Sequence, residues 1–538
     1  MRGADVLVQT LAKAGVTRIF SLSGNQIMPV YDACIDTDVR IIHTRHEATT
    51  VFMADAWAQL TGEIGVALVT AAPGFGNAIG PLFTAAASES PVLLLSGDAP
   101  AAKDGLGAFQ ELDQVAISKP LTKLSKRIMS ADAIASETAN AIRLARSGRP
   151  GPVHLALPFD VVQADADSAD TSPGFAAQND ALAPQTGEIA AIREAIASSE
   201  RPIILTGPQL NATRAAALLQ SLELALSVPV VAMESPRGLN DPALGGIGQV
   251  VGQADLIVCL GKKVDFTLGF AAEPKFGKNC KWIVVDADAS ACEMASRNLG
   301  KRLLHSIQAL PEAVAETLSW EPGPSTNVQQ QWLDAVKALT RARSYAATAG
   351  DGGSRITSLS LCEAVQRQID QVPQSLFLAD GGEFGQWAQA VLEADERVIN
   401  GTAGAIGGVL CNALAARCAR PDAAIFALMG DGTVGFQFAE FETAVREKLP
   451  FVAVIGNDLC WNAEHQIQLR DYGPERLIGC QLSEARYDLA VVGLGGHGEF
   501  VTDAAELDDA LERALKSGLP ACVNVRIKGL PAPTYSAH

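Results

Sequence analysis

Short apolar runs alternate with stretches of helical periodicity along most of the chain. The runs lie at residues 66–70, 92–96, 153–157, 202–206, 256–260, 282–286, 375–379, 424–429 and 451–455. Runs of this length, separated by helical periods, predict buried strands of parallel sheets. They fall into three stretches, 1–164, 188–322 and 355–530, separated by small-residue segments at 165–187 and 346–354. We therefore predict an α/β protein with three doubly wound, parallel-sheet domains.

Composition narrows the class of protein. The 538 residues are 48% hydrophobic, which is enough to fill several cores, and the net charge is −18. Nucleic acids and anionic membranes both favour basic surfaces, so we expect neither as a partner. No apolar run approaches the ~18 residues that span a bilayer. Ten cysteines without Cys-x-x-Cys spacing suit a reducing compartment. We expect a cytoplasmic enzyme with a small-molecule substrate.

Two aspartates follow neighbouring predicted strands in the last stretch. Asp431 lies in Gly430-Asp-Gly-Thr433 after the run 424–429, and Asp458 follows the run 451–455. Residues 436–448 between them predict a helix. Parallel strands bring their carboxyl ends to one edge of the sheet, where ligands bind. Carboxylates beside glycines there suit Mg²⁺ carrying a diphosphate, although a Gly-Asp-Gly turn and an ordinary strand end explain the same residues.

The first stretch offers an acid and a glycine-rich turn. Glu47 begins an Ala-rich predicted helix, where a carboxylate is favoured by the helix dipole or serves as a proton donor to a heteroaromatic ring. Gly74, Gly76 and Gly80 follow the run 66–70, and Asp98 follows the next strand. That arrangement admits an NAD-dependent dehydrogenase as an alternative, although the spacing departs from the dinucleotide fingerprint.

Together and in this order, the segments resemble the thiamine-diphosphate-dependent enzymes of the acetolactate synthase type. They are most similar to the branch that includes benzaldehyde lyase. The resemblance covers essentially the whole chain and is carried by residues 109–116, 148–160 and 430–450. It implies pyrimidine-binding, central and diphosphate-binding domains. It also implies an enzyme that makes or breaks a carbon–carbon bond next to a carbonyl in 2-oxo acids, 2-hydroxy ketones or aldehydes. A 2-oxo acid decarboxylase is the alternative within the family.

The resemblance assigns roles to individual residues. Glu47 and Gln110 would be catalytic, with Glu47 exchanging a proton with the aminopyrimidine ring and Gln110 binding the reacting oxygen. The Mg²⁺ ligands would be Asp431, Asp458 and the carbonyl of Cys460. Besides Glu47 and these ligands, the residues that contact the cofactor would be Pro73, Asn77, Gly382, Glu383, Phe384, Gly404, Ile406 (as a wedge under its rings), Gly432, Thr433, Trp461 and Asn462. The substrate pocket would contain Asn25, Gln26, Phe109, Gln110, Phe159 and Trp461.

Some positions depart from the family pattern. Asp458 stands where the second metal ligand is usually Asn, and its carboxylate is still a suitable ligand. Phe159 replaces a Lys of acetolactate synthases, and residues 261–270 lack their Arg-containing flavin segment, so FAD is not expected. Gln26 stands where benzaldehyde lyase has a histidine. Because the family builds each active site from two subunits, the resemblance implies a homodimer or homotetramer with shared sites.

Overall fold

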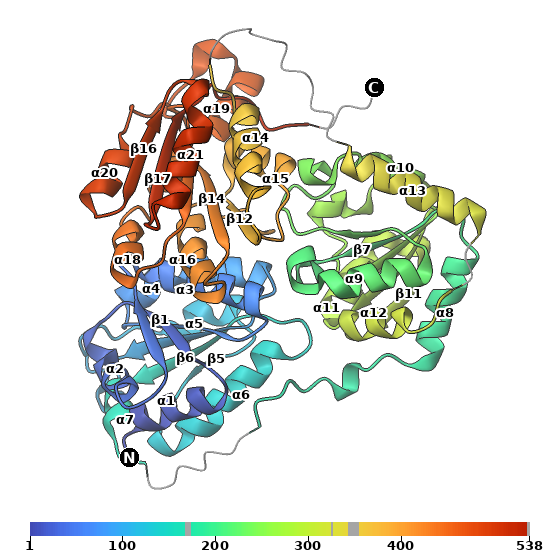
Figure 1. The fold of residues 1–538 in the computed structure, drawn as a ribbon. Helices are drawn as coiled ribbons and strands as arrows, with labels where there is room; N and C mark the ends of the chain where they lie inside the picture. The colour runs from blue at the N-terminus through green and yellow to red at the C-terminus, as the bar shows by residue number, and fades with distance from the viewer. Residues whose placement is uncertain (167–173, 324–325, 343–354, 535–538) are drawn as a thin grey trace.

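The computed structural model describes residues 1–166, 174–323, 326–342 and 355–534. Three open parallel sheets are each covered by helices, and Figure 1 shows them as three bodies in contact. This confirms the predicted fold class. The predicted segment 346–354 lies outside the described residues, as do residues 167–173 of the segment 165–187. The predicted domain limits remain predictions.

The N-terminal sheet has six strands in the order β2-β1-β3-β4-β6-β5. Its strands are β1 (Arg18–Ser21), β2 (Arg40–His43), β3 (Gly65–Val69), β4 (Val92–Asp98), β5 (Ser125–Arg127) and β6 (Val153–Pro158). Its helices are α1 (Gly3–Lys13), α2 (Met28–Cys34), α3 (Glu47–Thr61), α4 (Pro73–Ala87), α5 (Gln114–Ser118), α6 (Ile134–Arg146) and α7 (Phe159–Gln163). Every strand pairs in parallel with its neighbours, so the strand ends that carry loops to the helices share one edge.

The central sheet has five strands in the order β11-β10-β9-β7-β8. They are β7 (Pro202–Thr206), β8 (Val230–Ala232), β9 (Leu256–Leu260), β10 (Lys281–Asp286) and β11 (Leu303–Gln308). The helices are α8 (Thr186–Ala197), α9 (Ala212–Leu226), α10 (Ile247–Gln253), α11 (Ala289–Leu299), α12 (Pro311–Ser319) and α13 (Asn327–Arg341). Alternate residues of β9 belong to separate cores on the two faces, because successive side chains of a strand point to opposite sides.

The C-terminal sheet has six strands in the order β13-β12-β14-β15-β17-β16, which repeats the winding of the N-terminal sheet. They are β12 (Ser375–Ala379), β13 (Glu396–Ile399), β14 (Ala424–Gly430), β15 (Val452–Asn457), β16 (His497–Val501) and β17 (Ala521–Arg526). The helices are α14 (Ser358–Ile369), α15 (Gly382–Val391), α16 (Val409–Ala419), α17 (Asp431–Val434), α18 (Glu440–Glu447), α19 (Asn462–Tyr472), α20 (Tyr487–Gly493) and α21 (Leu507–Lys516). The first and last parts of the chain therefore present equivalent edges.

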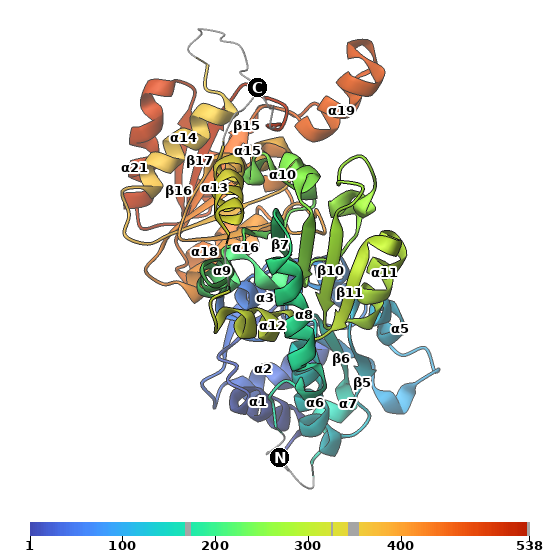
Figure 2. The same cartoon turned by 90° about the vertical axis from the view of Figure 1, so that its right-hand side faces the viewer.

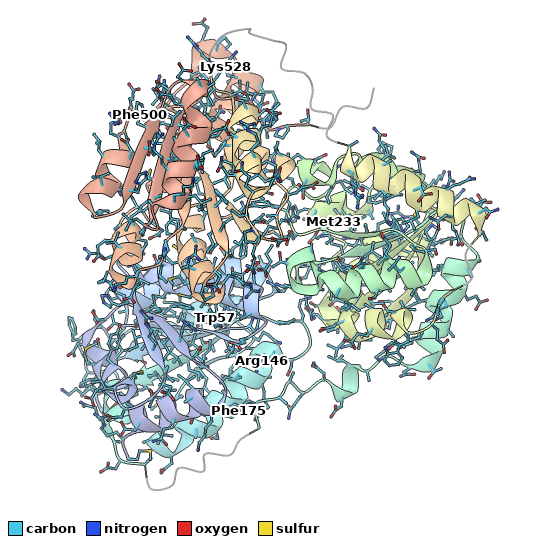
Figure 3. The ribbon with its side chains drawn as sticks, viewed as in Figure 1. Trp57, Arg146, Phe175, Met233, Phe500 and Lys528 are labelled. Carbon is cyan, nitrogen blue, oxygen red and sulfur yellow. The ribbon has the colours of Figure 1, made fainter. Side chains whose placement is uncertain are left out.

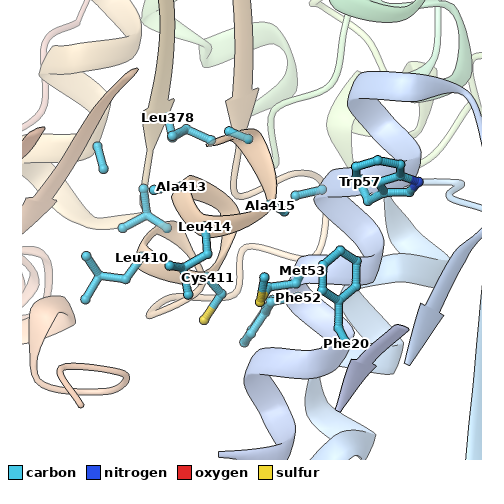
Figure 4. Packing of buried hydrophobic residues seen from close by; sticks show 14 of the residues in the cluster. Phe20, Phe52, Met53, Trp57, Leu378, Leu410, Cys411, Ala413, Leu414 and Ala415 are labelled. Carbon is cyan, nitrogen blue, oxygen red and sulfur yellow. The ribbon is translucent and has the colours of Figure 1, made fainter. Parts of the chain in front are cut away.

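One apolar core joins the N- and C-terminal sheets. It contains Phe52 and Trp57 of α3 together with Leu410 and Leu414 of α16, all nearly fully buried. Figure 4 shows Phe52 and Met53 of α3 facing Cys411 of α16, and Figure 3 places Trp57 at the junction of the two bodies. Separate cores fill the outer faces of both sheets. The N- and C-terminal parts of one chain are thus held by a continuous apolar layer.

Buried ion pairs attach the central body to the N-terminal one. Arg149 pairs with Glu89 of its own body and with Asp286 at the end of β10. Arg214 of α9 donates to the carbonyl oxygens of Ser88 and Glu89 at 2.8 and 3.0 Å. Because these charges are largely removed from water, they are stable only while paired, which fixes how the two bodies dock. Within the described residues, no helix combines the length and apolarity needed to cross a membrane.

The predicted helix over 436–448 was wrong in its limits. The chain forms a short helix, α17, directly from Asp431, and the next helix, α18, begins only at Glu440. Between them Phe436 packs edge-on to Trp461, with ring centroids 6.1 Å apart, and Gly407 comes so close that a Cβ there would meet Phe436 at 2.5 Å. These distant contacts interrupt the helical periodicity that the local sequence suggests.

Candidate active site

The carboxyl ends of the C-terminal strands enclose a cavity of about 190 Å³. Segments that follow β12, β13, β14 and β15 line it. The lining includes all the predicted residues of this part of the chain, namely Gly382, Glu383, Phe384, Gly404, Ile406, Asp431, Gly432, Thr433, Asp458, Cys460, Trp461 and Asn462. Residues up to 80 positions apart therefore converge because parallel strands end at one edge.

The two aspartates form the acidic wall of this cavity. Asp431 is only 2% exposed, and neither of its carboxylate oxygens has a hydrogen-bond partner among the described residues. Burial raises the pKa of Asp431 to about 6. Burial, followed by the nearby charge of Asp431, raises the pKa of Asp458 to about 7. A buried carboxylate pair without a cation is unfavourable, so the donor set fits a divalent metal ion.

The rest of a metal coordination shell has to come from other atoms. Within the described ranges, no group of three or more His, Cys, Asp or Glu side chains could hold a metal ion. The two carboxylates leave positions for a backbone carbonyl, such as that of Cys460 in the cavity wall, and for oxygens of a bound diphosphate. A metal here would therefore depend on its ligand's phosphates, which is the usual arrangement for Mg²⁺.

Glycines bring flat and branched side chains close to the backbone of the cavity. A Cβ on Gly432 would lie 2.6 Å from the Trp461 ring, and one on Gly456 would lie 2.6 Å from the ring of Phe384. Gly382, with φ of +80°, begins α15, whose first N–H groups have no partner within the helix. Helix N-termini and bare glycine backbone suit phosphate oxygens. Ile406 is half-buried and lines the cavity instead of entering a core.

A second group of predicted residues lies at the carboxyl edge of the N-terminal sheet. Glu47 is the first residue of α3, and the amide of Asn77 donates to its carboxylate at 2.9 Å. Pro73 occupies the first position of α4, and a Cβ on Gly74 would approach Glu47 Oε1 at 3.2 Å. In the single chain the Glu47 side chain is half-buried. Its carboxylate therefore remains accessible to a ligand or to a second subunit.

The predicted substrate residues follow β1, β4 and β6 at the same edge. Gln26 is 4% exposed, accepts a hydrogen bond from Thr70 at 2.8 Å and donates one to Gln110 at 2.7 Å. Gln26 thus holds the side chain of Gln110 by this hydrogen bond. The backbone of Gln110 adopts a left-handed φ of 60°. Phe109 is 75% exposed and Asn25 is exposed. Phe159, the first residue of α7, is half-buried, and Trp461 belongs to the other cavity.

Two supporting residues were not predicted. Thr70, at the end of β3, anchors Gln26 as described. Gln114 is 1% exposed, accepts from the N–H of Ala72 at 3.1 Å and donates to the carbonyl of Gly97 at 3.0 Å. It thereby ties the turn before Pro73 to the loop that carries Gln110. A polar residue that ends an apolar predicted strand, here the run 66–70, is the signal that would have drawn attention to Thr70.

The geometry does not support a dinucleotide site at the glycine-rich turn. Gly74, Gly76 and Gly80 lie within α4 and not in a loop before it. Asp98, the expected ribose acceptor, is 3% exposed and forms an ion pair with Arg127 at 2.6 Å. Because its carboxylate is already paired and buried, it is not available to a ribose hydroxyl.

Comparison with known protein families matches both of the domains whose sheet edges carry these residues. Residues 1–117 match the thiamine pyrophosphate enzyme N-terminal TPP binding domain, residues 189–300 its central domain, and residues 380–525 its C-terminal TPP binding domain. The chain belongs to the thiamine pyrophosphate enzyme family. The two TPP binding domains of the family correspond to the two sheets that share one winding order, and thiamine pyrophosphate (thiamine diphosphate) is the cofactor that they bind.

Curated relatives of this thiamine pyrophosphate enzyme cover 98% of its length. A probable acetolactate synthase of Mycobacterium bovis is 31% identical over 98% of this chain and 95% of its own length. The 2-hydroxyacyl-CoA lyase 2 of Danio rerio is 29% identical over 98% of this chain and 91% of its own, and that of Homo sapiens is 28% identical over 98% and 90%. The prediction of an enzyme of the acetolactate synthase type within this family is confirmed.

Proposed function

We propose that this protein is a thiamine-diphosphate- and Mg²⁺-dependent enzyme that makes or breaks a carbon–carbon bond next to a carbonyl. Its substrates would be 2-oxo acids, 2-hydroxy ketones or aldehydes. The observation that carries the proposal is the buried Asp431 carboxylate, without a partner among the described residues, beside Asp458 at a glycine-lined strand edge. The relatives are named a synthase and a lyase, so the proposal includes both directions.

Each half of the site has its own task in this proposal. Asp431, Asp458 and the carbonyl of Cys460 would hold Mg²⁺. Helix N-termini and glycine backbone in the same cavity would bind the diphosphate. Bound thiamine diphosphate supplies a nucleophilic ring carbon and an acceptor for the negative charge left by bond cleavage. Glu47 would hold and move a proton at the aminopyrimidine ring, and Asn77 orients its carboxylate.

The substrate would meet residues of the N-terminal edge. Gln110 would donate an N–H to the reacting oxygen, because its amide oxygen already accepts from Gln26. Phe159 would present an aromatic surface where acetolactate synthases have a cation, which favours an uncharged part of the substrate at this position. The exposed ring of Phe109 would close over the substrate.

We infer that a second copy of the chain completes the site. The residues for the pyrimidine and those for the diphosphate lie on separate sheets of the same winding. Figure 2 shows α19 extending outward from the C-terminal sheet, and none of its residues is buried in the single chain. The loop with Phe109 and Leu106 is also exposed, at 75% and 78%. The exposed apolar side chains of this loop, together with Ile467 and Tyr472 of α19 at 45% and 63%, support a homodimer or homotetramer.

The central domain would hold no dinucleotide in this proposal. Ligands of such sheets bind at the switch point of strand order, here between β7 and β9. Arg149 reaches this point, donating to the carbonyl of Gly261 at 3.3 Å while paired with two carboxylates. Because these ion pairs occupy the switch point, where a dinucleotide would bind, we expect neither FAD nor NAD there. All ten cysteines are free thiols, which supports a reducing, cytoplasmic setting.

Calorimetry and one variant test the proposal. Protein stripped with chelator should bind thiamine diphosphate saturably with Mg²⁺ and weakly without it. Glu47→Gln should retain the fold and this binding but lose turnover by about 10²–10⁴-fold. Product analysis with 2-oxo acids and aldehydes separates carboligation from simple decarboxylation. If the stripped wild type binds no thiamine diphosphate in either condition, the proposal fails.

A further inference from the structure

A buried glutamate of the C-terminal domain contacts the start of the helix that carries Glu47. Glu440, the first residue of α18, is 1% exposed. Its Oε1 accepts from the backbone N–H groups of Arg45 and His46 at 3.0 and 3.1 Å, and from the hydroxyl of Thr49 at 2.7 Å. Its Oε2 accepts from Thr443 at 2.6 Å. A carboxylate is an acceptor only, so all four donors match its chemistry.

These contacts cross nearly 400 positions of sequence. Arg45 and His46 directly precede α3, and Glu47 is its first residue. The N–H groups before and within the first turn of a helix have no partner inside the helix, so a buried helix start requires an acceptor from elsewhere. His46 caps one N–H of the first turn, that of Ala48, at 3.1 Å. Glu440 accepts hydrogen bonds from the N–H groups of Arg45 and His46, which directly precede this turn.

The remainder of α18 reinforces the same attachment. Arg446 donates to the carbonyl of His43 at 2.6 Å, and Glu447 pairs with Arg40 of β2 at 2.7 Å. Glu442 lies 3.6 Å from the guanidinium of Arg45. The chain from β2 to the first turn of α3 is therefore fastened along its length to α18. Only Glu440 within this group is fully buried and reaches the backbone next to Glu47.

We propose that Glu440 is a positioning residue for Glu47. It fixes the backbone of Arg45 and His46, and thereby aims the Glu47 carboxylate towards Asn77 and towards a ligand at the N-terminal edge. This inference rests on the proposed function, in which Glu47 moves a proton. A misplacement of about 1 Å in a catalytic group can cost on the order of 10²-fold in rate. The C-terminal domain thus contributes to the N-terminal half-site of its own chain without contacting the ligand.

Three variants of the full-length protein separate positioning from charge. Glu440→Ala removes every acceptor. Glu440→Gln keeps one carboxamide oxygen for the N–H groups and turns its NH₂ towards the Thr443 hydroxyl, which can accept. Glu447→Gln is the matched control, because it neutralises a carboxylate of the same helix that pairs with Arg40 but not with the start of α3.

Amide hydrogen exchange of residues 44–50 in the cofactor-free protein reads the attachment directly, without activity. We expect Glu440→Ala to lose protection there by at least tenfold, Glu440→Gln to keep most of it, and Glu447→Gln to match the wild type. With thiamine diphosphate and Mg²⁺, kcat of Glu440→Ala should fall about 10–100-fold. The calorimetric Kd for the cofactor should change less than threefold, because the diphosphate residues are untouched. Glu440→Gln should lose less kcat than Glu440→Ala.

The outcomes distinguish this inference from the proposed function. If Glu440→Ala has the same amide hydrogen exchange at residues 44–50 and the same kcat as Glu447→Gln, the inference is overturned while the proposed function stands. If the wild type binds no thiamine diphosphate but Glu440→Ala still loses protection at 44–50, the proposed function fails and the structural attachment stands. Should Glu440→Ala not fold, Glu440→Asp keeps the charge and shortens the reach. Wild-type protection in that variant would also overturn the inference.

Discussion

Replacing Asp458 with Asn should stabilise the metal-free enzyme at neutral and alkaline pH while weakening its hold on Mg²⁺. The carboxyl has an ordinary pKa of 3.8, and burial together with the Asp431 charge raises it to about 7 in the folded chain. At about 1.4 kcal/mol for each tenfold change in proton affinity, the full cost would be roughly 4 kcal/mol. Because the side chain is partly exposed and titrates together with Asp431, we expect about half, or ~2 kcal/mol.

The sign of the effect follows from which state binds the proton. Between about pH 4 and pH 7 the unfolded chain has released the Asp458 proton while the folded chain still holds it, so stability falls as pH rises. Above pH 7 this loss of folding stability is complete, and below pH 4 there is no such loss. The Asn side chain carries no such proton. The stabilisation of Asp458→Asn over wild type should therefore be largest at pH 8 and small at pH 5.

Denaturant unfolding of chelator-treated protein at pH 5 and pH 8 measures this difference. Asp471→Asn is the control, because Asp471 is an exposed carboxylate in an ion pair with Arg470 and should show no gain at pH 8. Adding Mg²⁺ with thiamine diphosphate should then stabilise the wild type more than the variant, because Asn supplies a neutral ligand. A metal-free Asp458→Asn protein that is less stable than wild type at pH 8 would refute the reasoning.

Three further changes test other parts of the structure. Arg149→Ala leaves two buried carboxylates unpaired and should cost about 3–5 kcal/mol in chemical denaturation; an unchanged midpoint would contradict it. Burial lowers the pKa of His154 to about 3, so its contribution to the free energy of unfolding should fall by about 2 kcal/mol between pH 6.5 and 5, and the stability of the wild type relative to His154→Asn should fall by that amount. Gly432→Ala drives a Cβ into Trp461 and should weaken calorimetric cofactor binding about tenfold, whereas Gly187→Ala, with open space around it, should not.

Strands were predictable because their signals are local. The apolar runs at 202–206, 256–260 and 375–379 are the observed strands β7, β9 and β12. In a parallel sheet both faces are covered, so a strand is apolar throughout and contrasts with its polar flanks. Helices were less secure, as the break between α17 and α18 shows. There the path is set by packing of Phe436 against Trp461 and Gly407, which no local pattern records.

The sequence also placed the candidate site residues at strand ends, since the order of strand, turn and polar residue can be read along the chain. Glu47, Asp431 and Asp458 follow β2, β14 and β15 as that order requires. Their roles in binding and catalysis remain predictions. What the residue types determined was the kind of chemistry that each edge can support, namely carboxylates for a cation or a proton and glycines for phosphate.

Only the tertiary structure decided which side chains support one another. Gln26, a predicted substrate residue, has its amide engaged by Thr70 and by Gln110, which lies 84 positions away. Glu440 reaches the start of α3 across nearly 400 positions. Hydrogen bonds depend on distance and direction in space, and a buried polar group accepts whichever partner the packing brings to it. The sequence by itself determined the sheets and the residue types at the carboxyl ends of their strands. Packing of the folded chain determined which partners orient those side chains.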